Sequence, residues 1–403
     1  MTHSVVKSEK IGSGWTELTV GSLFEILEKK CPRFQRMCSN GKQAEKVTTI
    51  AIPPDNGYMS LVFRLDVHFD QTNDGILSYC LKEPRAERMT ELLNIDFFPI
   101  LIEIHGRECD FYENFSQVSG LKIPRVHAIK RLSLEDKKGY LLMDFAGNRS
   151  CRTVPIEQSL SVEQVIAIAD QIARLHAHVL LDSNKWDEDK RFEPVNIVAS
   201  DEGMGNEVFG RLHGRLRKYT DDDLMRRIDE FSGLLDNHDV YNYVVFDAHR
   251  ELGLPSLTSH GDLWGNNVLF EINENGEITD QIGGLIDWQA TNFGNPTQDL
   301  VRVMLVSMDA ELRRKNQKKI LEVYFNKLGE HLKGMKVPFS LNQLEAAAQS
   351  FFIYQLALLM FITAHNFEND SMIEQRSVYI ERLRAALEDL GPIVSKYLSK
   401  WKV

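Results

Sequence analysis

The segment SHGDLWGNNVLF (259–270) constrains this chain more than any other, because it places several polar side chains inside an apolar run. Short apolar runs bounded by turn residues are typical of buried elements, where an unpaired polar group costs about 1–3 kcal/mol. Asp262 and Asn267 lie five residues apart in this segment. Either these groups satisfy one another as a buried polar network, or they hold a ligand.

A further acidic residue, Asp287, follows the short apolar run GGLI, twenty residues beyond Asn267. The turn sequence NENG (273–276) predicts a hairpin between the two apolar runs. Asp262, Asn267 and Asp287 would then lie at the ends of adjacent strands and offer oxygen atoms, the ligands that Mg²⁺ prefers. Their joint order and spacing favour a metal and phosphate site over a buried network or a chance set of turn residues.

The first part of the chain predicts a small antiparallel sheet of five strands with one prominent helix. Residues 61–69 alternate apolar and polar side chains, which is typical of a half-buried strand. Lys82 ends the next predicted strand, and residues 105–115 indicate a helix that carries Glu108. A lysine held by a carboxylate keeps its ammonium pointed at phosphate groups. Asp110 is the alternative partner for this lysine.

The rest of the chain predicts helices. Residues 161–180 begin with a capping box formed by Ser161 and Gln164, and they carry an apolar stripe. The apolar stretch 351–364 is too short to span a bilayer comfortably, so we interpret it as a buried helix. The charged stretch 182–237 has little periodicity, and we interpret it as a solvated face with loops.

Composition excludes some classes of function. The 58 acidic residues outnumber the 47 Lys and Arg, giving a net charge of −11, whereas a nucleic-acid binder carries a basic surplus or stripe. The five cysteines form no CxxC pair, and the N-terminal residues lack the apolar stretch of a secretory signal. We therefore expect a cytoplasmic monomer with reduced thiols that binds neither nucleic acid nor membranes.

These motifs resemble a known family when they are taken together. HGDLWGNN and LIDWQATNFGNPTQDL are similar to sequences of the aminoglycoside phosphotransferase and choline kinase group. With YCLKEP, HGRECDFY and Asp-Trp in place of Asp-Phe-Gly, the chain most resembles the ecdysteroid-kinase-like (CHK kinase-like) family over residues 45–390. The resemblance implies an α+β, protein-kinase-like two-lobed fold with a small antiparallel-sheet N-lobe and a larger, mainly helical C-lobe.

The resemblance also implies where each lobe begins and ends and what it does. Residues 1–146 would form the N-terminal lobe with the nucleotide-binding sheet. Residues 147–403 would form the C-terminal lobe with the catalytic loop and the acceptor site, and the charged stretch 182–237 lies where the family places that acceptor site.

Family roles carry over to individual positions. Asp262 matches the catalytic aspartate that orients the acceptor hydroxyl, Asn267 and Asp287 match the Mg²⁺ ligands, and Lys82 with Glu108 matches the pair that holds the phosphates of ATP. The phosphate-covering loop PPDNGYMS contributes Gly57 and Ser60, although it is not a GxGxxG motif. The hinge that would receive adenine contains Asp144, Phe145 and Ala146.

Several prominent residues have structural interpretations instead. We expect His260 to brace the catalytic loop, Asp299 to hold backbone groups near it, and His176 to lie in the core. Trp264 and Trp288 are expected to pack, although either could line the acceptor pocket.

The resemblance implies an ATP-dependent, Mg²⁺-dependent kinase that transfers the γ-phosphate to a hydroxyl of a small molecule, with a steroid-like or xenobiotic alcohol favoured. A choline or ethanolamine kinase is one alternative. A catalytically idle small-molecule-binding protein on a kinase fold is another. A protein kinase is disfavoured, because the chain has neither a DFG nor an APE segment.

Overall fold

The structure is a computed structural model of the chain, and it describes residues 2–4, 9–52, 59–69, 75–147, 150–186, 190–193, 206–235, 237–366 and 375–401. The chain divides into two compact units. The first consists of Met1–Gln117, Ile123–Cys151 and Gly284–Gln289, and the second consists of Val118–Lys122, Arg152–Gly283 and Ala290–Val403. Asp287 therefore belongs to the same unit as Lys82, although 205 residues separate them in sequence.

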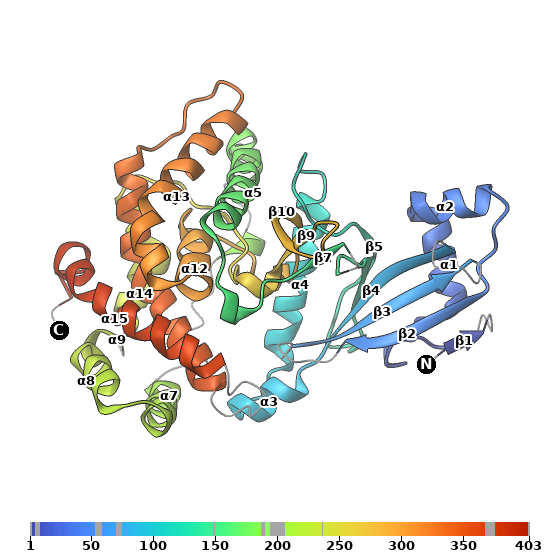
Figure 1. Ribbon diagram of the computed structural model, residues 1–403. Coiled ribbons are helices and arrows are strands. Elements are labelled where there is room, and N and C mark those ends of the chain that lie inside the picture. The colour runs from blue at the N-terminus through green and yellow to red at the C-terminus, as the bar shows by residue number, and fades with distance from the viewer. Residues whose placement is uncertain are drawn as a thin grey trace. The chain divides into compact units, whose positions relative to one another are not determined.

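The first unit is built on a six-stranded antiparallel sheet with the order β1-β2-β3-β4-β6-β5. Figure 1 shows β2, β3 and β4 side by side, in blue. One strand more than predicted is present, because residues 2–4 pair with β2. The strands are β1 (Thr2–Ser4), β2 (Lys46–Ile52), β3 (Ser60–His68), β4 (Ile76–Pro84), β5 (Val126–Lys130) and β6 (Tyr140–Asp144), and the helices are α1 (Val20–Lys30), α2 (Pro32–Ser39), α3 (Glu87–Leu93) and α4 (Phe98–Phe115).

Alternation along the strands gives this sheet its main core. Leu65 and Val67 of β3 are fully buried, and they pack in one cluster with residues of α1 and α2 such as Leu23 and Phe34. Helix α1 begins at a capping box in which the Thr19 side chain accepts from the Ser22 backbone N–H. The two helices therefore cover the sheet face that carries the buried side chains.

The second unit is mainly helical, in agreement with the predicted α+β class. Helix α5 packs against α13, and α14 packs against both α12 and α15. Its small sheets have the orders β10-β9-β7 and β11-β8. The helices are α5 (Val162–Leu181), α6 (Ser183–Trp186), α7 (Asn206–Tyr219), α8 (Asp222–Glu230), α9 (Ser232–Leu235), α10 (His238–Asn242), α11 (Ala248–Glu251), α12 (Gln298–Ser307), α13 (Ala310–His331), α14 (Leu341–Asn366) and α15 (Arg376–Tyr397), and the strands are β7 (Cys151–Arg152), β8 (Leu257–Ser259), β9 (Val268–Ile272), β10 (Ile278–Leu285) and β11 (Asn292–Gly294). Short 3₁₀ segments lie at Ile156–Gln158, Lys190–Phe192, Gly265–Asn267 and Trp288–Ala290, and a π-helical segment lies at Tyr243–Asp247.

The capping box, the turn and the buried histidine predicted for this unit are present in the structure. The Ser161 side chain accepts from the Gln164 backbone N–H at the start of α5. The turn between β9 and β10 closes with a 3.0 Å hydrogen bond from the Asn273 N–H to the Glu277 carbonyl oxygen. His176 is fully buried, and its ring nitrogens lie 2.6 Å from the Tyr324 hydroxyl and 2.8 Å from the Thr258 carbonyl oxygen. Burial lowers the pKa of His176 to about 4, so it is a neutral core residue.

Helix α14 contains the apolar stretch interpreted above as a buried helix. Its residues 341–364 meet the length and composition of a membrane span, and 72% of the qualifying window is buried inside the protein. Helix α14 packs against α12, α13 and α15, which is the behaviour of a core helix.

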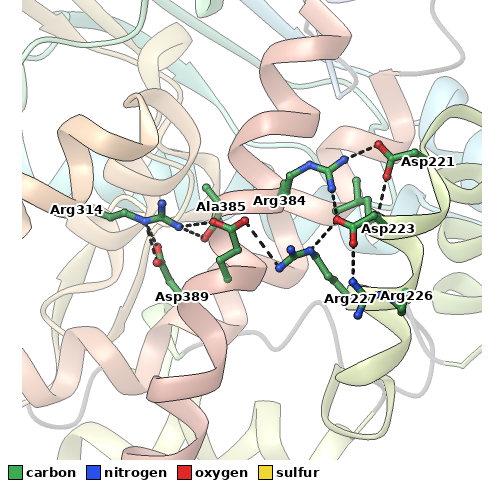
Figure 2. A network of polar contacts seen from close by, with 10 residues as sticks. Asp221, Asp223, Arg226, Arg227, Arg314, Arg384, Ala385 and Asp389 are labelled. Carbon is green, nitrogen blue, oxygen red and sulfur yellow. Dashed lines mark hydrogen bonds and ion pairs between the residues drawn. The ribbon is translucent and has the colours of Figure 1, made fainter.

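The charged stretch 182–237 contains helices rather than only loops, which corrects the prediction for it. Helix α8 buries just Leu224, Met225 and Ile228, and its polar face joins a network of ion pairs shown in Figure 2. Arg384 of α15 contacts Asp221 and Asp223 at 2.7 and 2.8 Å. The same network continues through Glu388 and Asp389 of α15 to Arg314 of α13. These ion pairs join α8 to residues that are distant in sequence, so local periodicity does not reveal them.

Candidate functional site

Lys82 lies on β4 between β3 and β6, where it pairs with Val62 and Leu141. Leu81 and Tyr79 on the opposite face of β4 are buried in the cluster with α1 and α2. The side-chain period of two therefore turns Lys82 toward the other face of the sheet. Its side chain is 12% exposed, so an ammonium here needs partners within the protein.

Glu108 of α4 supplies the first partner. Its two carboxylate oxygens lie 2.9 and 2.7 Å from the Lys82 Nζ. Glu108 shares the buried helix face with Leu101, Phe111 and Phe115, which lie seven residues before it and three and seven residues after it. Asp110, the alternative partner predicted for Lys82, pairs instead with Arg131 at 2.8 Å.

Asp287 supplies the second partner through a close ion pair with Lys82. Its backbone is in the left-handed region, with φ of +70°, which is rare for a residue other than glycine. Such a conformation costs of order 1–3 kcal/mol and is concentrated at functional sites. The next residue, Trp288, is fully buried and stacks on Phe111 with ring centroids 3.7 Å apart. Packing of this tryptophan therefore holds Asp287 in its strained conformation.

The cluster carries one excess negative charge, since two carboxylates face one ammonium. Burial alone would lower the pKa of Lys82, but the Asp287 and Glu108 carboxylates outweigh it and raise that pKa above its ordinary value. Burial raises the pKa of Glu108, and the Lys82 ammonium only partly opposes this shift. The Asp287 side chain is 29% exposed against 2% for Glu108, so Asp287 is the carboxylate of this pair that a solvent cation can reach.

The second unit contains the loop that follows β8. Asp299, at the start of α12, accepts hydrogen bonds from the backbone N–H groups of His260 at 2.7 Å and Gly261 at 3.0 Å. The Asp262 N–H in turn donates to His260 Nδ1 at 3.3 Å. Burial raises the pKa of Asp299 despite these bonds. The structure thus places His260 and Asp299 in the bracing positions expected for them.

Asp262 is partly exposed in this loop. Its side chain is 34% exposed, and its Oδ1 accepts from Arg302 at 2.6 Å. Asn267 donates its side-chain amide to the Asp262 carbonyl oxygen at 2.8 Å. This bond commits the nitrogen of the Asn267 amide to the loop, which leaves its oxygen as the group suited to a cation.

Arg302 is the residue that sequence reasoning missed. It is 4% exposed, and among the described residues its Nε and one of its terminal nitrogens have no hydrogen-bond partner. Asp299 and Arg302 lie three residues apart on α12, so both face the loop, and Ser307 at the end of the helix accepts from the Gly265 N–H at 2.9 Å. An arginine three residues after Asp299 in an otherwise apolar helix was the available signal.

The structure describes only some of the residues that are predicted to surround the nucleotide. Gly57 lies outside the described residues. Ser60 begins β3 opposite Pro84 of β4. At the predicted hinge, the N–H groups of Asp144 and Phe145 donate to Arg125 and Ser78 at 2.8 and 3.2 Å. Ala146 is then the remaining candidate to offer a backbone N–H to adenine.

The chain is similar to known proteins in both sequence and fold. Residues 77–396 match the family DUF1679, which is described as "Uncharacterized oxidoreductase dhs-27". The Caenorhabditis elegans protein of that name is 24% identical over 326 residues, which cover 77% of this chain and 38% of that protein. The chain thus spans under half the length of that relative. A second C. elegans relative, "Uncharacterized kinase-like protein D1044.1", is 27% identical over 300 residues, covering 72% of this chain and 74% of the relative.

A solved structure confirms the predicted fold. The chain superimposes on the choline kinase of Cryptosporidium parvum Iowa II with a TM-score of 0.51 and 12% identity, covering 94% of this chain and 96% of that one. At this identity the likeness concerns the fold alone. The chain has the two-lobed α+β architecture of the protein-kinase-like group.

Proposed function

Because the chain belongs to the DUF1679 family and has a kinase-like fold, we propose that it is an ATP-dependent small-molecule kinase. The observation that carries this proposal is the ion-pair cluster of Lys82, Glu108 and Asp287. A purely structural cluster would gain nothing from an excess buried charge and a strained aspartate. A phosphate-binding site would use both.

Each unit would supply a distinct part of the chemistry. Lys82, oriented by Glu108, would neutralise charge on the phosphates of ATP. Asp262 would accept the hydrogen bond of the acceptor hydroxyl and take its proton as the new oxygen–phosphorus bond forms and the bond from the γ-phosphorus to ADP breaks. Arg302 would act as a positioning residue, because its contact with one oxygen of Asp262 fixes the orientation of that carboxylate.

We propose Mg²⁺ as the cation, because the family that the motifs resemble uses it and the side chains concerned have the right chemistry. Asn267 and Asp287 offer amide and carboxylate oxygens, which suit a hard cation. The cluster around Asp287 has the excess negative charge that a cation would offset. Mg²⁺ bound to these residues would supply charge neutralisation for the phosphates during transfer.

For the acceptor we propose a steroid-like or xenobiotic alcohol, on the resemblance of the motifs to ecdysteroid-kinase-like sequences. Choline or ethanolamine is the second candidate, favoured by the choline kinase that shares the fold. The oxidoreductase name belongs to a relative of which this chain spans 38%. Every strand pair with a described register is antiparallel, whereas dinucleotide-binding folds use parallel sheets.

The test combines nucleotide binding with two substitutions. We expect ATP with Mg²⁺ at 100 times its dissociation constant to stabilise the protein by about 2.7 kcal/mol. Asp287→Ala should remove the Mg²⁺ dependence of this stabilisation and abolish transfer. Asp262→Asn should keep the stabilisation but lower phosphoryl transfer by about 100-fold or more, which is the usual contribution of a general base.

The same assay separates the alternatives. Stabilisation by ATP without transfer to steroid-like alcohols, choline or ethanolamine would favour an idle binding protein. Absence of any stabilisation by Mg²⁺ and ATP would contradict the proposed function.

A further inference from the structure

A second cluster in the first unit contains metal-ligating side chains that the proposed function does not use as ligands. Cys31, His127 and Asp144 each place one potential ligand atom within 4.8 Å of the others. They come from three separate elements, since Cys31 lies at the junction of α1 and α2, His127 on β5 and Asp144 at the end of β6. A sulfur, a nitrogen and an oxygen atom that can bind a metal therefore converge from distant parts of the chain.

The cluster is closed on one side and open on the other. Cys31 and His127 are each 1% exposed, whereas the Asp144 side chain is 29% exposed. An ion could therefore reach the buried ligands past Asp144. Cys31 is also the N-cap residue of α2, but its side chain makes no capping hydrogen bond. Its sulfur contacts the Tyr79 hydroxyl at 3.4 Å instead.

The hydrogen-bonding capacity of His127 is only partly used within the protein. Its Nε2 lies 2.8 Å from the Asp144 Oδ1, and among the described residues its buried Nδ1 has no hydrogen-bond partner. A buried polar atom without a partner costs about 1–3 kcal/mol. A buried imidazole nitrogen without a partner, beside a thiol and a carboxylate, indicates that this cluster can bind a metal ion.

We propose that Cys31, His127 and Asp144 form a Zn²⁺ site. Thiolate and imidazole ligands select zinc over magnesium or calcium. A thiolate and a carboxylate together carry two negative charges, which match a divalent ion. Three protein ligands and a water complete the tetrahedral coordination usual for zinc, with bonds of about 2.0–2.3 Å. Tyr79 would donate its hydroxyl hydrogen bond to the metal-bound sulfur and orient it.

A metal ion at this site would link helices α1 and α2 to the sheet that they cover. A bound ion would tie the corner between α1 and α2 to β5 and to the end of β6. Asp144 is also the first residue of the predicted adenine hinge, so the metal would fix the strand that leads into it. Metal binding should therefore stabilise the first unit independently of ATP.

The experiment uses the full chain stripped of metal and then titrated with Zn²⁺ or Co²⁺ in excess Mg²⁺, which occupies oxygen-only sites. We expect one equivalent of Zn²⁺ per chain, and a near-ultraviolet charge-transfer band with Co²⁺ that reports a thiolate ligand. Cys31→Ser should abolish the band and weaken zinc binding at least tenfold. Cys38→Ser, seven residues further on at an exposed position of α2, is the matched control and should leave both unchanged.

A second variant tests the site independently, in case Cys31→Ser does not fold. In His127→Gln the amide can still donate to Asp144, so the fold is spared while an imidazole ligand is lost. Zinc affinity should again fall at least tenfold. Absence of the cobalt band in the unmodified protein, or a band that survives Cys31→Ser, would overturn the zinc site without bearing on the kinase proposal.

Discussion

At the scale of single residues, the two candidate-site segments contain buried acids and tightly constrained backbone positions. Glu108 is a buried acid whose pKa burial raises, and Asp287 is held at a positive φ. Gly261 has φ of +85°, and a Cβ placed on it would lie 2.1 Å from the Ala290 carbonyl oxygen. These positions tolerate few replacements, so each gives a sharp prediction.

Glu108 should make stability depend on pH. Because its pKa is raised above the ordinary 4.5, the folded protein binds its proton more readily than the unfolded chain does. Stability contributed by this group is therefore lost as the pH rises from 4.5 through the raised pKa. Urea unfolding of Glu108→Gln should lack this decline, whereas Asp110→Asn on the same helix should retain it. An identical pH dependence in Glu108→Gln and the unmodified protein would contradict the assignment.

Gly261 should be irreplaceable, and Gly276 offers a matched control. Gly276 has nearly the same φ, +82°, but no described atom lies within 4 Å of a Cβ placed there. Gly276→Ala should cost about 1–2 kcal/mol, the usual cost of the left-handed conformation. Gly261→Ala should cost about 1–3 kcal/mol more, because the new methyl group meets backbone. Equal losses in denaturant unfolding would show that the loop can move aside.

At the scale of elements, helix α12 organises the predicted catalytic loop. Asp299, Arg302 and Ser307 contact three parts of the segment 260–265, so one short buried helix sets the loop's shape. The sequence predicted the bracing role of Asp299. For Arg302 it offered only the position three residues after Asp299, because a contact with Asp262, forty positions away, leaves no local pattern. The capping box of α5 was predictable for the opposite reason, since its two partners are three residues apart.

The ion-pair network of Figure 2 should control the local stability of α8. Arg384→Met removes the contacts to Asp221 and Asp223 that join α8 to α15. We expect faster hydrogen exchange of the α8 amides with little change in global stability, because these pairs are largely exposed. Arg226→Met, at a 68% exposed position within α8, is the control. Unchanged exchange in Arg384→Met would mean that apolar contacts alone hold α8.

At the scale of the whole molecule, the chain combines a kinase-like fold with a net charge of −11, and neither feature identifies an acceptor for the proposed reaction. The α+β class was predictable from the sequence, because local periodicity shows strand patterns in the first part of the chain and helix patterns in the rest. The inclusion of residues 284–289 in the first unit was not predictable, since it depends on tertiary contacts such as the stacking of Trp288 on Phe111. Acceptor identity depends on the details of a site rather than on the fold.

The most direct test of the central claim is untargeted mass spectrometry of a metabolite extract incubated with the protein, Mg²⁺ and ATP. Asp262→Asn, treated identically, is the control. We predict at least one metabolite that gains a phosphoryl group with the unmodified protein and not with Asp262→Asn, and that metabolite identifies the acceptor class. The same phosphorylated products from both proteins, or no product together with no stabilisation by Mg²⁺ and ATP, would contradict the account.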